Sequence, residues 1–339
     1  MSLLVVGDVS LHDWRPREVL ALPEVDGARV VFNLESPAGN SFRRASGPAL
    51  GASIEALDAL RHWTGSVAAL ANNHLLDAGD EGAATIEALA RMNIQWLGAR
   101  GRSFVDLQDE GRPMRVFNWV TAETTPGPAS AAGPCHFPGL SQAMLEIREA
   151  KARGLSVLVY LHWGLELFPY PTPEDRQRAH ALARAGADAI IGAHPHVIRG
   201  VEWVGKTPVL YSLGNYHFGD MYDECGQLIV KQVKRTRLAM AARLTCGADG
   251  SVDVKLTSYR RGSRGPERDF HETAKNMLER LSVPLELPLE RYADWYARWV
   301  RRRFPLFRLW HFRRHEVSIR DWPRAAYRIG VRKGRALLK

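Results

Sequence analysis

The stretch Val157-Leu158-Val159-Tyr160-Leu161-His162-Trp163-Gly164-Leu165-Glu166 decides the fold, because an apolar run typical of a buried strand ends directly in a histidine and a carboxylate. Two other apolar runs, residues 67–70 and 189–191, are followed in the same way by Ala71-Asn72-Asn73-His74 and Gly192-Ala193-His194-Pro195-His196. Two earlier runs end in acids: residues 3–6 precede Gly7-Asp8, and residues 30–32 precede Asn33-Leu34-Glu35. Strand-like runs along the chain thus end repeatedly in side chains that can carry chemistry.

In an α/β sheet the carboxyl ends of parallel strands share one edge, and ligands bind along that edge. We therefore expect these side chains to gather at one place, although they are far apart in the sequence. Imidazoles, carboxylates and a carboxamide together are the ligands of a divalent metal ion. The pattern predicts a metal-dependent, phosphoesterase-like site.

Helical patterns alternate with these strands, at residues 53–62, 81–92, 140–153 and 173–185. The last helix should begin with Thr172 as N-cap and Pro173 in its first turn, and should end at Gly186. Alternation of strands and helices is typical of a layered α/β core built from βαβ units.

After Tyr211 the pattern becomes that of antiparallel strands, at residues 227–234, 238–245 and 252–259. Residues 260–268, rich in Gly, Arg and Ser, are interpreted as a linker. Helices are expected beyond it, at residues 269–281, 289–303 and 322–338. We therefore expect a core domain over residues 1–260 and a basic, aromatic-rich helical extension over residues 261–339.

The 339 residues have the composition of an ordinary globular protein, with 45% hydrophobic and 24% charged residues. No stretch approaches the roughly 20 apolar residues that a membrane span needs, and the first strand starts too early for a signal peptide. Cys135, Cys225 and Cys246 are scattered, which predicts neither a disulfide framework nor a zinc knuckle. We therefore expect a cytoplasmic protein, peripheral at the inner face of the membrane if its tail binds lipid.

The positive charge is concentrated at the C-terminus. Residues 290–339 hold 15 Lys or Arg and 4 Asp or Glu, a balance of +11, so the first 289 residues carry −2 of the chain's +9. Tyr292, Trp295, Tyr296 and Trp299 share one face of a predicted helix. Such a helix either packs on the core through its aromatic residues or lies on an anionic membrane surface. Single-stranded nucleic acid suits the same mixture of residues, but no nucleic-acid-binding motif accompanies it, so nucleic acid is not the expected partner.

Six motifs in sequence order resemble those of a known family. They are Gly7-Asp8, Asn33-Leu34-Glu35, Ala71-Asn72-Asn73-His74 with Asp77 and Gly79, His162-Trp163-Gly164 with Glu166, residues 192–197, and Tyr211-Ser212-Leu213-Gly214-Asn215. Together they resemble the CapA family of capsule and poly-γ-glutamate biosynthesis proteins, over residues 3–220. That family looks like a branch of the calcineurin-like metallophosphoesterases, which implies a four-layer α/β/β/α sandwich, here with a C-terminal helical extension.

The resemblance also implies roles for individual residues. Asp8 would be the first ligand and Glu35 a bridging ligand of one or two divalent ions (Mn, Fe or Zn). The remaining metal ligands would be Asn73, His162, His194 and His196. His74 would be the catalytic acid, which suits an imidazole near neutral pH. Ser10 stands where these phosphoesterases usually carry a histidine, and His12 can replace it only if the loop after Val9 curls back.

Other residues near these motifs are further candidates. Glu166, four residues after His162, is a catalytic ligand, a partner that orients an imidazole, or a substrate contact. Arg43, Arg44 and Arg199 are candidates for substrate binding, because a guanidinium matches a phosphate or a carboxylate. Asn215 would donate to a ligand from the floor of the site, and Asp77 would cap the following helix or brace the loop.

The expected function is that of a CapA-like metal-dependent hydrolase of the phosphoester type, in the biosynthesis of capsule, poly-γ-glutamate or another extracellular polymer. Its partner would be an anionic substrate or polymer precursor. Two alternatives stay open. One is a non-catalytic scaffold subunit of an envelope-polymer synthase, which the serine at position 10 favours. The other is a metal-dependent amide hydrolase, since the same metal chemistry serves either bond.

Overall fold

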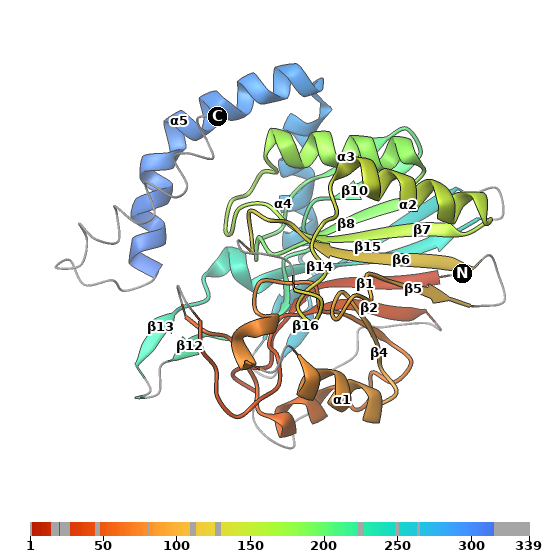
Figure 1. Ribbon diagram of the computed structural model, residues 1–339. Coiled ribbons are helices and arrows are strands. Elements are labelled where there is room, and N and C mark those ends of the chain that lie inside the picture. The colour runs from red at the N-terminus through yellow and green to blue at the C-terminus, as the bar shows by residue number, and fades with distance from the viewer. Residues whose placement is uncertain are drawn as a thin grey trace. The chain divides into compact units, whose positions relative to one another are not determined.

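The computed structural model describes residues 2–14, 20, 28–44, 48–79, 82–108, 113–125, 130–222, 225, 227–247, 251–262 and 265–314, with side chains up to residue 302. The chain divides into two compact units. The first comprises residues 1–219 and 232–294, and the second comprises residues 220–231 and the chain from residue 295 on. The first unit holds both large sheets (Figure 1).

One of these sheets is mixed and contains the first strands of the chain. Its order is β16 (Pro266–Arg268), β15 (Val252–Arg261), β14 (Leu238–Cys246), β1 (Ser2–Val9), β2 (Arg29–Leu34), β3 (Val67–Ala69) and β4 (Gln95–Leu97). Strands β1 to β4 run parallel, whereas β14 to β16 pair in antiparallel fashion. The short β11 (Asn215–His217) pairs in parallel with the end of β1, at Asp8 and Val9. The carboxyl ends of β1 and β2 therefore lie side by side.

The second sheet has a parallel centre and antiparallel edges. Its order is β5 (Phe104–Leu107), β6 (Met114–Val120), β7 (Ser156–His162), β8 (Ala189–Ala193), β10 (Thr207–Leu210) and β9 (Val201–Val204). The strands β6, β7, β8 and β10 run parallel, and only β5 and β9 at the edges are antiparallel. The histidine-bearing ends of β7 and β8 are therefore neighbours.

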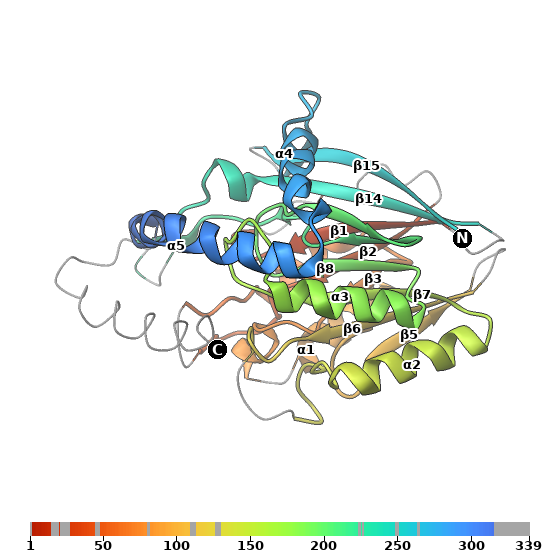
Figure 2. The same cartoon turned by 90° about the horizontal axis from the view of Figure 1, so that it is seen from above.

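The two sheets pack face to face and are covered by helices outside. Val5 and Val31 of the first sheet share a buried cluster with Leu158 and Ile191 of the second, as alternation along a strand predicts. Helix α1 (Ala83–Arg91) and the 3-10 helix η1 (Ile54–Leu60) cover the outer face of the first sheet. Helices α2 (Leu140–Ala152) and α3 (Pro173–Ala185) cover the outer face of the second (Figure 2). The predicted four-layer α/β/β/α sandwich is confirmed.

The start of α3 follows the expected capping pattern. Thr172 Oγ1 accepts from the Asp175 amide at 3.1 Å, and Asp175 Oδ2 accepts from the Thr172 amide at 3.0 Å. This reciprocal capping box satisfies amides that the first turn leaves without partners. Pro173 occupies the first turn, and Gly186 ends the helix with φ +111°. The boundaries predicted for this helix are confirmed.

The chain after β15 returns to the first unit. Helix α4 (Thr273–Ser282) packs on β14, β15 and β9, and the 3-10 helix η4 (Val283–Glu286) follows it. The buried Arg176 pairs with Glu202 at 2.8 Å and donates to the carbonyls of Leu285 and Leu287. The interpretation of residues 260–268 as a linker is wrong, because β15 runs to Arg261 and β16 adds an edge strand. The domain boundary between residues 260 and 261 stays a prediction.

The second unit contains a small hairpin and most of the last helix. Strand β12 (Met221–Tyr222) pairs in antiparallel fashion with β13 (Leu228–Val230). Helix α5 (Leu289–Arg314) begins in the first unit and continues into the second. The helix predicted at residues 322–338 lies outside the described residues. In the described part of the chain, no helix combines the length and the apolar character that crossing a membrane requires.

Candidate metal centre

Both sheets contribute strand ends to the same place. Asp8 is the second-to-last residue of β1, and Glu35 follows β2 directly. His162 is the last residue of β7, and His194 follows β8. The predicted ligands therefore meet at the common carboxyl edge of two packed sheets rather than along one sheet.

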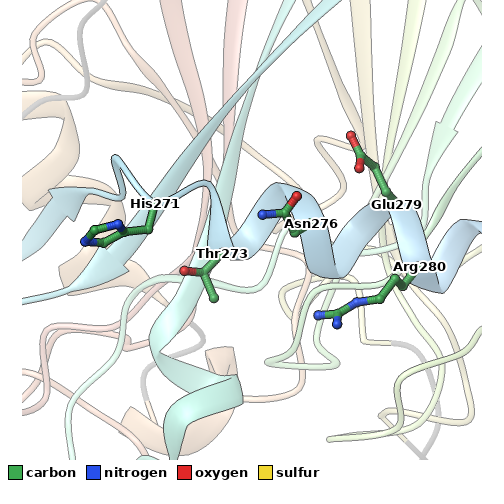
Figure 3. A pocket seen from close by; sticks show the side chains of 5 residues that line it. All are labelled: His271, Thr273, Asn276, Glu279 and Arg280. Atoms are coloured by element: carbon green, nitrogen blue, oxygen red, sulfur yellow. The ribbon is translucent and has the colours of Figure 1, made fainter.

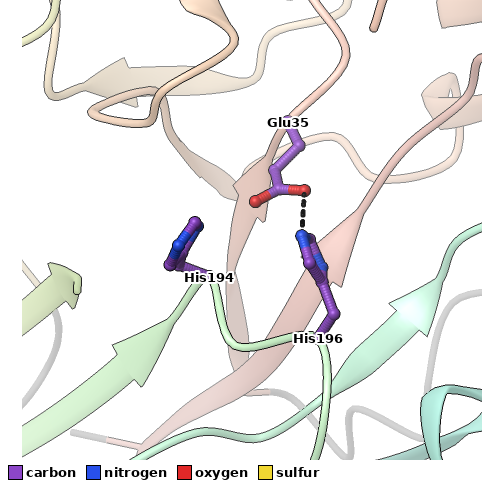
Figure 4. A group of neighbouring side chains, drawn as sticks. All are labelled: Glu35, His194 and His196. Atoms are coloured by element: carbon purple, nitrogen blue, oxygen red, sulfur yellow. Dashed lines mark ion pairs between the residues drawn. The ribbon is translucent and has the colours of Figure 1, made fainter. Parts of the chain in front are cut away.

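Two groups of potential ligands share one carboxylate. Glu35, His194 and His196 form one group, and Asp8, Glu35 and His162 form the other. Within each group, one ligand atom per residue lies within 4.8 Å of the others, and all members are buried. In Figure 4, His194 and His196 approach Glu35 from one loop. Glu35 is the residue common to both groups, and the bridging role that the resemblance implies for it stays a prediction.

The carboxylate of Glu35 faces different imidazoles with its two oxygens. Its Oε1 lies 3.7 Å from Nε2 of His162, and its Oε2 lies 3.6 Å from Nε2 of His196. Among the described residues, neither oxygen accepts a hydrogen bond, nor does Oδ2 of Asp8, although all three atoms are buried. Buried acceptors without donors are costly, and a divalent cation would satisfy them. The mixture of imidazole nitrogen and carboxylate oxygen fits Mn, Fe or Zn.

The loop after β8 is strained at both histidines. His194 has φ +93° and His196 has φ +56°, a region that residues with a side chain rarely adopt. Such strain persists where surrounding contacts over-determine the backbone, and it is frequent at functional sites. Here the His194 amide donates to Oδ1 of Asp8 at 3.4 Å, and Nδ1 of His196 lies 2.9 Å from Oδ1 of Asn215. Both strained residues belong, together with Glu35, to one ligand group.

Carboxamides surround the ligands. Oδ1 of Asn73 lies 2.8 Å from Nε2 of His162, which places this predicted ligand beside the second group. Asn33 donates to Oδ1 of Asp8 at 2.8 Å, and Asn72 donates to the carbonyl of Leu34 at 2.8 Å. Asn33 and Asn72 were not predicted as site residues. Both could have been predicted from the sequence, because they lie in the same motifs as Glu35 and Asn73.

His74 lies outside both ligand groups and takes part in a separate set of side-chain contacts. Its Nδ1 lies 2.7 Å from Oδ2 of Asp77, and one terminal nitrogen of Arg44 lies 2.5 Å from Nδ1 and 3.0 Å from Nε2 of the same ring. Asp77 also accepts from the Leu50 amide at 2.9 Å, so it braces the loop, one of the two roles expected for it. Burial lowers the pKa of His74 to about 4. The neutral imidazole is therefore the favoured form in this environment.

Burial and neighbouring charges shift the pKa values of the candidate ligands. Burial raises the pKa of Glu35 to about 8, and the nearby charge of Asp8 adds to the rise. Burial lowers the pKa of His162 well below its usual range. Burial opposes protonation of His196 too, but Glu35 and Asp8 outweigh it and raise its pKa to about 10. The carboxylates thus depend on neighbouring positive charge, which a divalent cation would supply.

The predicted substrate residues divide into two kinds. Arg44, at 22% side-chain exposure, contacts His74, whereas Arg43 is exposed and its amide donates to the carbonyl of Asp77. Arg199 is fully buried and donates to backbone carbonyls of the loop after His162. Asn215 donates to the carbonyl of Thr236 at 3.1 Å while it contacts His196. The geometry of Arg199 and Asn215 is that of residues that hold other groups in place.

Glu166 and the region of Ser10 complete the surroundings. Glu166 is partly exposed, and its charge acts on both Glu35 and His196. The buried Ser10 contacts Nδ1 of His12 through its hydroxyl at 2.8 Å. His12 is not a member of either ligand group. Whether His12 replaces the usual histidine stays a prediction.

A hollow of about 480 Å³ lies along α4, and its lining residues follow the ligand groups by more than 70 residues in the sequence. It is lined by His271, Thr273, Asn276, Glu279 and Arg280 (Figure 3). These side chains follow one another along the helix rather than converging on a point. Among the described residues, the ligand groups are the two around Glu35, so this hollow is not the candidate metal centre.

The sequence profile of the family described as "Bacterial capsule synthesis protein PGA_cap" matches residues 2–220. The match ends just before β12 and therefore contains every residue of the two ligand groups.

Curated relatives match about half of the chain. The PGA biosynthesis protein CapA of Bacillus subtilis is 36% identical over 175 residues, which are 48% of this chain and 45% of the relative. The capsule biosynthesis protein CapA of Bacillus anthracis is 31% identical over 181 residues, 50% of this chain and 44% of the relative. A probable polyglutamine synthesis accessory protein of Mycobacterium tuberculosis is 32% identical over 182 residues, 48% of this chain and 47% of the relative. The matches thus span about half the length of these curated relatives.

Solved structures of low sequence identity are also similar. A 5'-nucleotidase precursor from Thermus thermophilus has a TM-score of 0.44 at 16% identity and covers 84% of this chain and 59% of its own. A putative 5'-nucleotidase from Staphylococcus aureus has a TM-score of 0.49 at 13% identity and covers 83% of this chain and 58% of its own.

Proposed function

The chain belongs to the PGA_cap family of bacterial capsule synthesis proteins, and from this premise we propose that it is a metal-dependent hydrolase of the phosphoester type in envelope-polymer biosynthesis. The substrate class would be an anionic polymer or its precursor. The family membership supports the pathway, and the ligand groups around Glu35 support the chemistry.

One observation carries the proposal: both oxygens of Glu35 are buried, lack hydrogen-bond donors among the described residues, and face imidazoles from two separate segments, the end of β7 and the loop after β8. A carboxylate placed only for stability would have its oxygens satisfied by amides or by an arginine. Two oxygens directed at two groups of nitrogen and oxygen donors suit a carboxylate that bridges cations. Such cations would be held by Asp8, Glu35, His162, His194 and His196, with Asn73 alongside.

The side chains divide the chemical work. A divalent cation, when bound, would lower the pKa of a water molecule and offset negative charge on the reacting group. His74 lies beside this centre, and its imidazole contacts both Asp77 and Arg44. Arg44 holds a positive charge that can pair with an anionic substrate, and His74 would handle the proton of the leaving oxygen once the substrate takes its place beside Arg44. Glu166 adds a negative charge beside the ligands.

The test is hydrolysis of bis-p-nitrophenyl phosphate by the purified protein with added Mn²⁺, Fe²⁺ or Zn²⁺. We expect release of p-nitrophenol that depends on the metal and is lost in Glu35→Gln, because the substitution removes the shared ligand. Tight metal binding without hydrolysis of this ester would contradict the enzymatic part of the proposal.

Two observations favour other functions. Ser10 bonds His12 where the resemblance places a histidine ligand, which favours a scaffold in which the metal is structural. The name of one relative refers to polyglutamine synthesis, and the backbone bonds of such a polymer are amides, which favours an amide hydrolase. Hydrolysis of a γ-glutamyl oligomer, measured beside the phosphodiester, separates the amide hydrolase from the phosphoesterase.

We also propose that the part of α5 in the second unit binds anionic lipid surfaces. Arg298, Arg301 and Arg302 are exposed there, and the rings of Trp295 and Trp299 stack with centroids 6.5 Å apart while half-exposed. Aromatic rings suit the headgroup region, and each basic residue near an anionic membrane contributes about 1 kcal/mol. The helix itself, without crossing the bilayer, would make a peripheral contact.

Replacing Arg298, Arg301 and Arg302 together by Gln should weaken binding to phosphatidylserine-containing vesicles by about 100-fold, since about 3 kcal/mol is removed. Co-sedimentation at two salt concentrations measures this, because screening weakens exposed charges. The matched control replaces Arg61, Arg91 and Arg153, exposed arginines of the first unit. Equal loss in both triple variants, or no vesicle binding by the intact chain, would contradict the lipid contact.

A further inference from the structure

A tight turn over residues 165–168 contains Glu166, whose charge acts on Glu35 and His196. The Phe168 amide donates to the carbonyl of Leu165 at 3.3 Å, which closes the turn. Leu167, its third residue, has φ +61°, a conformation that glycine normally supplies in such turns. The side chain of Leu167 is fully buried, so glycine at this position would lose its core contacts. The turn therefore combines a strained backbone with a buried side chain.

Arg199 holds both ends of this turn. Its Nε donates to the carbonyl of Phe168 at 2.9 Å, and its Nη2 donates to the carbonyl of Leu165 at 2.8 Å. The residue is fully buried. Because the guanidinium is planar, its donors have a fixed separation. One side chain thus fixes the two carbonyls that flank Glu166 and Leu167.

The charge of Arg199 is balanced from α3. Oδ2 of Asp175, itself buried, lies 3.8 Å from Nη1 of Arg199. The same carboxylate is part of the capping box that starts α3. Gly164 leaves room for this contact, since a Cβ there would lie 2.6 Å from Nη1 of Arg199 and 2.9 Å from Oδ2 of Asp175. The arrangement therefore depends on three residues from three different segments.

The turn is also tied to the loop that carries two of the ligands. The Leu167 amide donates to the carbonyl of Pro195 at 2.7 Å, between His194 and His196. Arg199 follows His196 by three residues, so the segment that supplies the imidazoles also supplies the arginine that holds the turn. Displacement of the turn would move the carboxylate of Glu166 relative to both histidines.

We propose that Arg199 is a positioning residue, which holds the turn at residues 165–168 so that Glu166 faces the metal centre and strengthens the binding of a divalent cation there. Arg199 thus acts through Glu166 and does not itself meet the substrate. The effect on the cation rests on the proposed function, whereas the hold on the turn does not.

The hold on the turn is tested by hydrogen exchange. Arg199→Lys keeps a positive charge opposite Asp175 but cannot donate to both carbonyls with a fixed geometry. We expect the Leu167 amide to exchange at least about tenfold faster than in the native chain, because its turn opens more often. Arg178→Met is the matched control, since Arg178 also contacts Asp175, at 3.2 Å, from outside the turn. Exchange in Arg199→Lys equal to that in Arg178→Met would overturn the proposal.

The action through Glu166 is tested by titration with Mn²⁺. Arg199→Lys and Glu166→Gln should each weaken Mn²⁺ binding by about tenfold, because the first lets the carboxylate of Glu166 move away from the cation and the second removes its charge. The double variant should bind no more weakly than the worse single variant, since residues that act as a unit are not additive. Glu166 is partly exposed, and glutamine keeps the length of its side chain, so Glu166→Gln serves also if the arginine variant is unstable.

The outcomes separate the inference from the proposed function. Native-like Mn²⁺ binding by Glu166→Gln, or losses that multiply to about 100-fold in the double variant, would overturn the role of Arg199 at the metal centre. Failure of the native chain to bind Mn²⁺, Fe²⁺ or Zn²⁺ would instead contradict the proposed function. In that case the exchange of the Leu167 amide still decides whether Arg199 holds the turn.

Discussion

Glu35→Gln should reduce divalent-metal affinity by about 100-fold or more and should affect both ligand groups at once. The reason is that Glu35 alone belongs to both groups, with one oxygen directed at His162 and the other at His196. Loss of residues that merely orient ligands already costs about 10–100-fold in metal affinity, so loss of a shared ligand should cost at least the upper end of that range. Titration with Mn²⁺ or Zn²⁺, with bound metal counted per chain, measures the effect.

His194→Ala provides the comparison, because His194 belongs to one group only. It should lower the amount of bound metal less than Glu35→Gln does. His62→Ala, an exposed histidine away from the motifs, is the matched control and should bind metal as the native chain does. Equal retention of metal in Glu35→Gln and His62→Ala would show that Glu35 is not a ligand.

His74→Ala should keep most of the metal and lose about 100-fold or more of the hydrolytic rate, the range usual for a group that handles a proton. The structure separates His74 from the ligands: it contacts Asp77 and Arg44 and is a member of neither group. Metal content and turnover of bis-p-nitrophenyl phosphate are measured on the same preparation.

His136→Ala controls for loss of a histidine elsewhere in the first unit. Asp77→Asn tests the contact between Asp77 and His74, and it should lower the rate by less than His74→Ala, because the imidazole remains and loses only the carboxylate beside its Nδ1. If His74→Ala loses as much metal as His194→Ala, then His74 is itself a ligand, and the division of roles is wrong.

The ligands were predictable because their signal is local. Each of Asp8, Glu35, His162 and His194 stands at the end of an apolar run, and the topology of parallel strands brings such ends to one edge. Residues that hold ligands from within the same motifs, such as Asn33, could have been found by extending each motif by one position. The capping box of α3 was predictable for the same reason, since Thr172 and Asp175 are neighbours in sequence.

Other features depend on contacts between segments that are distant in the sequence, so the local sequence did not predict them. Nothing in the sequence around Arg199 distinguishes a buried arginine that donates to backbone carbonyls from an exposed one that binds substrate. The turn at Leu167 could not be predicted from the sequence, because a leucine and not a glycine adopts the left-handed conformation. The strand β16 was missed because Pro266–Arg268 contains no run of β-branched or aromatic residues and forms an edge strand only through pairing with β15.

The most direct test of the account is the metal content of the purified native chain. Elemental analysis should find at least one Mn, Fe or Zn ion per chain, or a rise in melting temperature when these ions are added to a chelated sample, since a ligand that binds only the folded state stabilises it. The cluster of Asp8, Glu35, His162, His194 and His196 predicts this result. A chain that holds none of these ions and is not stabilised by any of them would contradict the metal centre, and with it the proposed function.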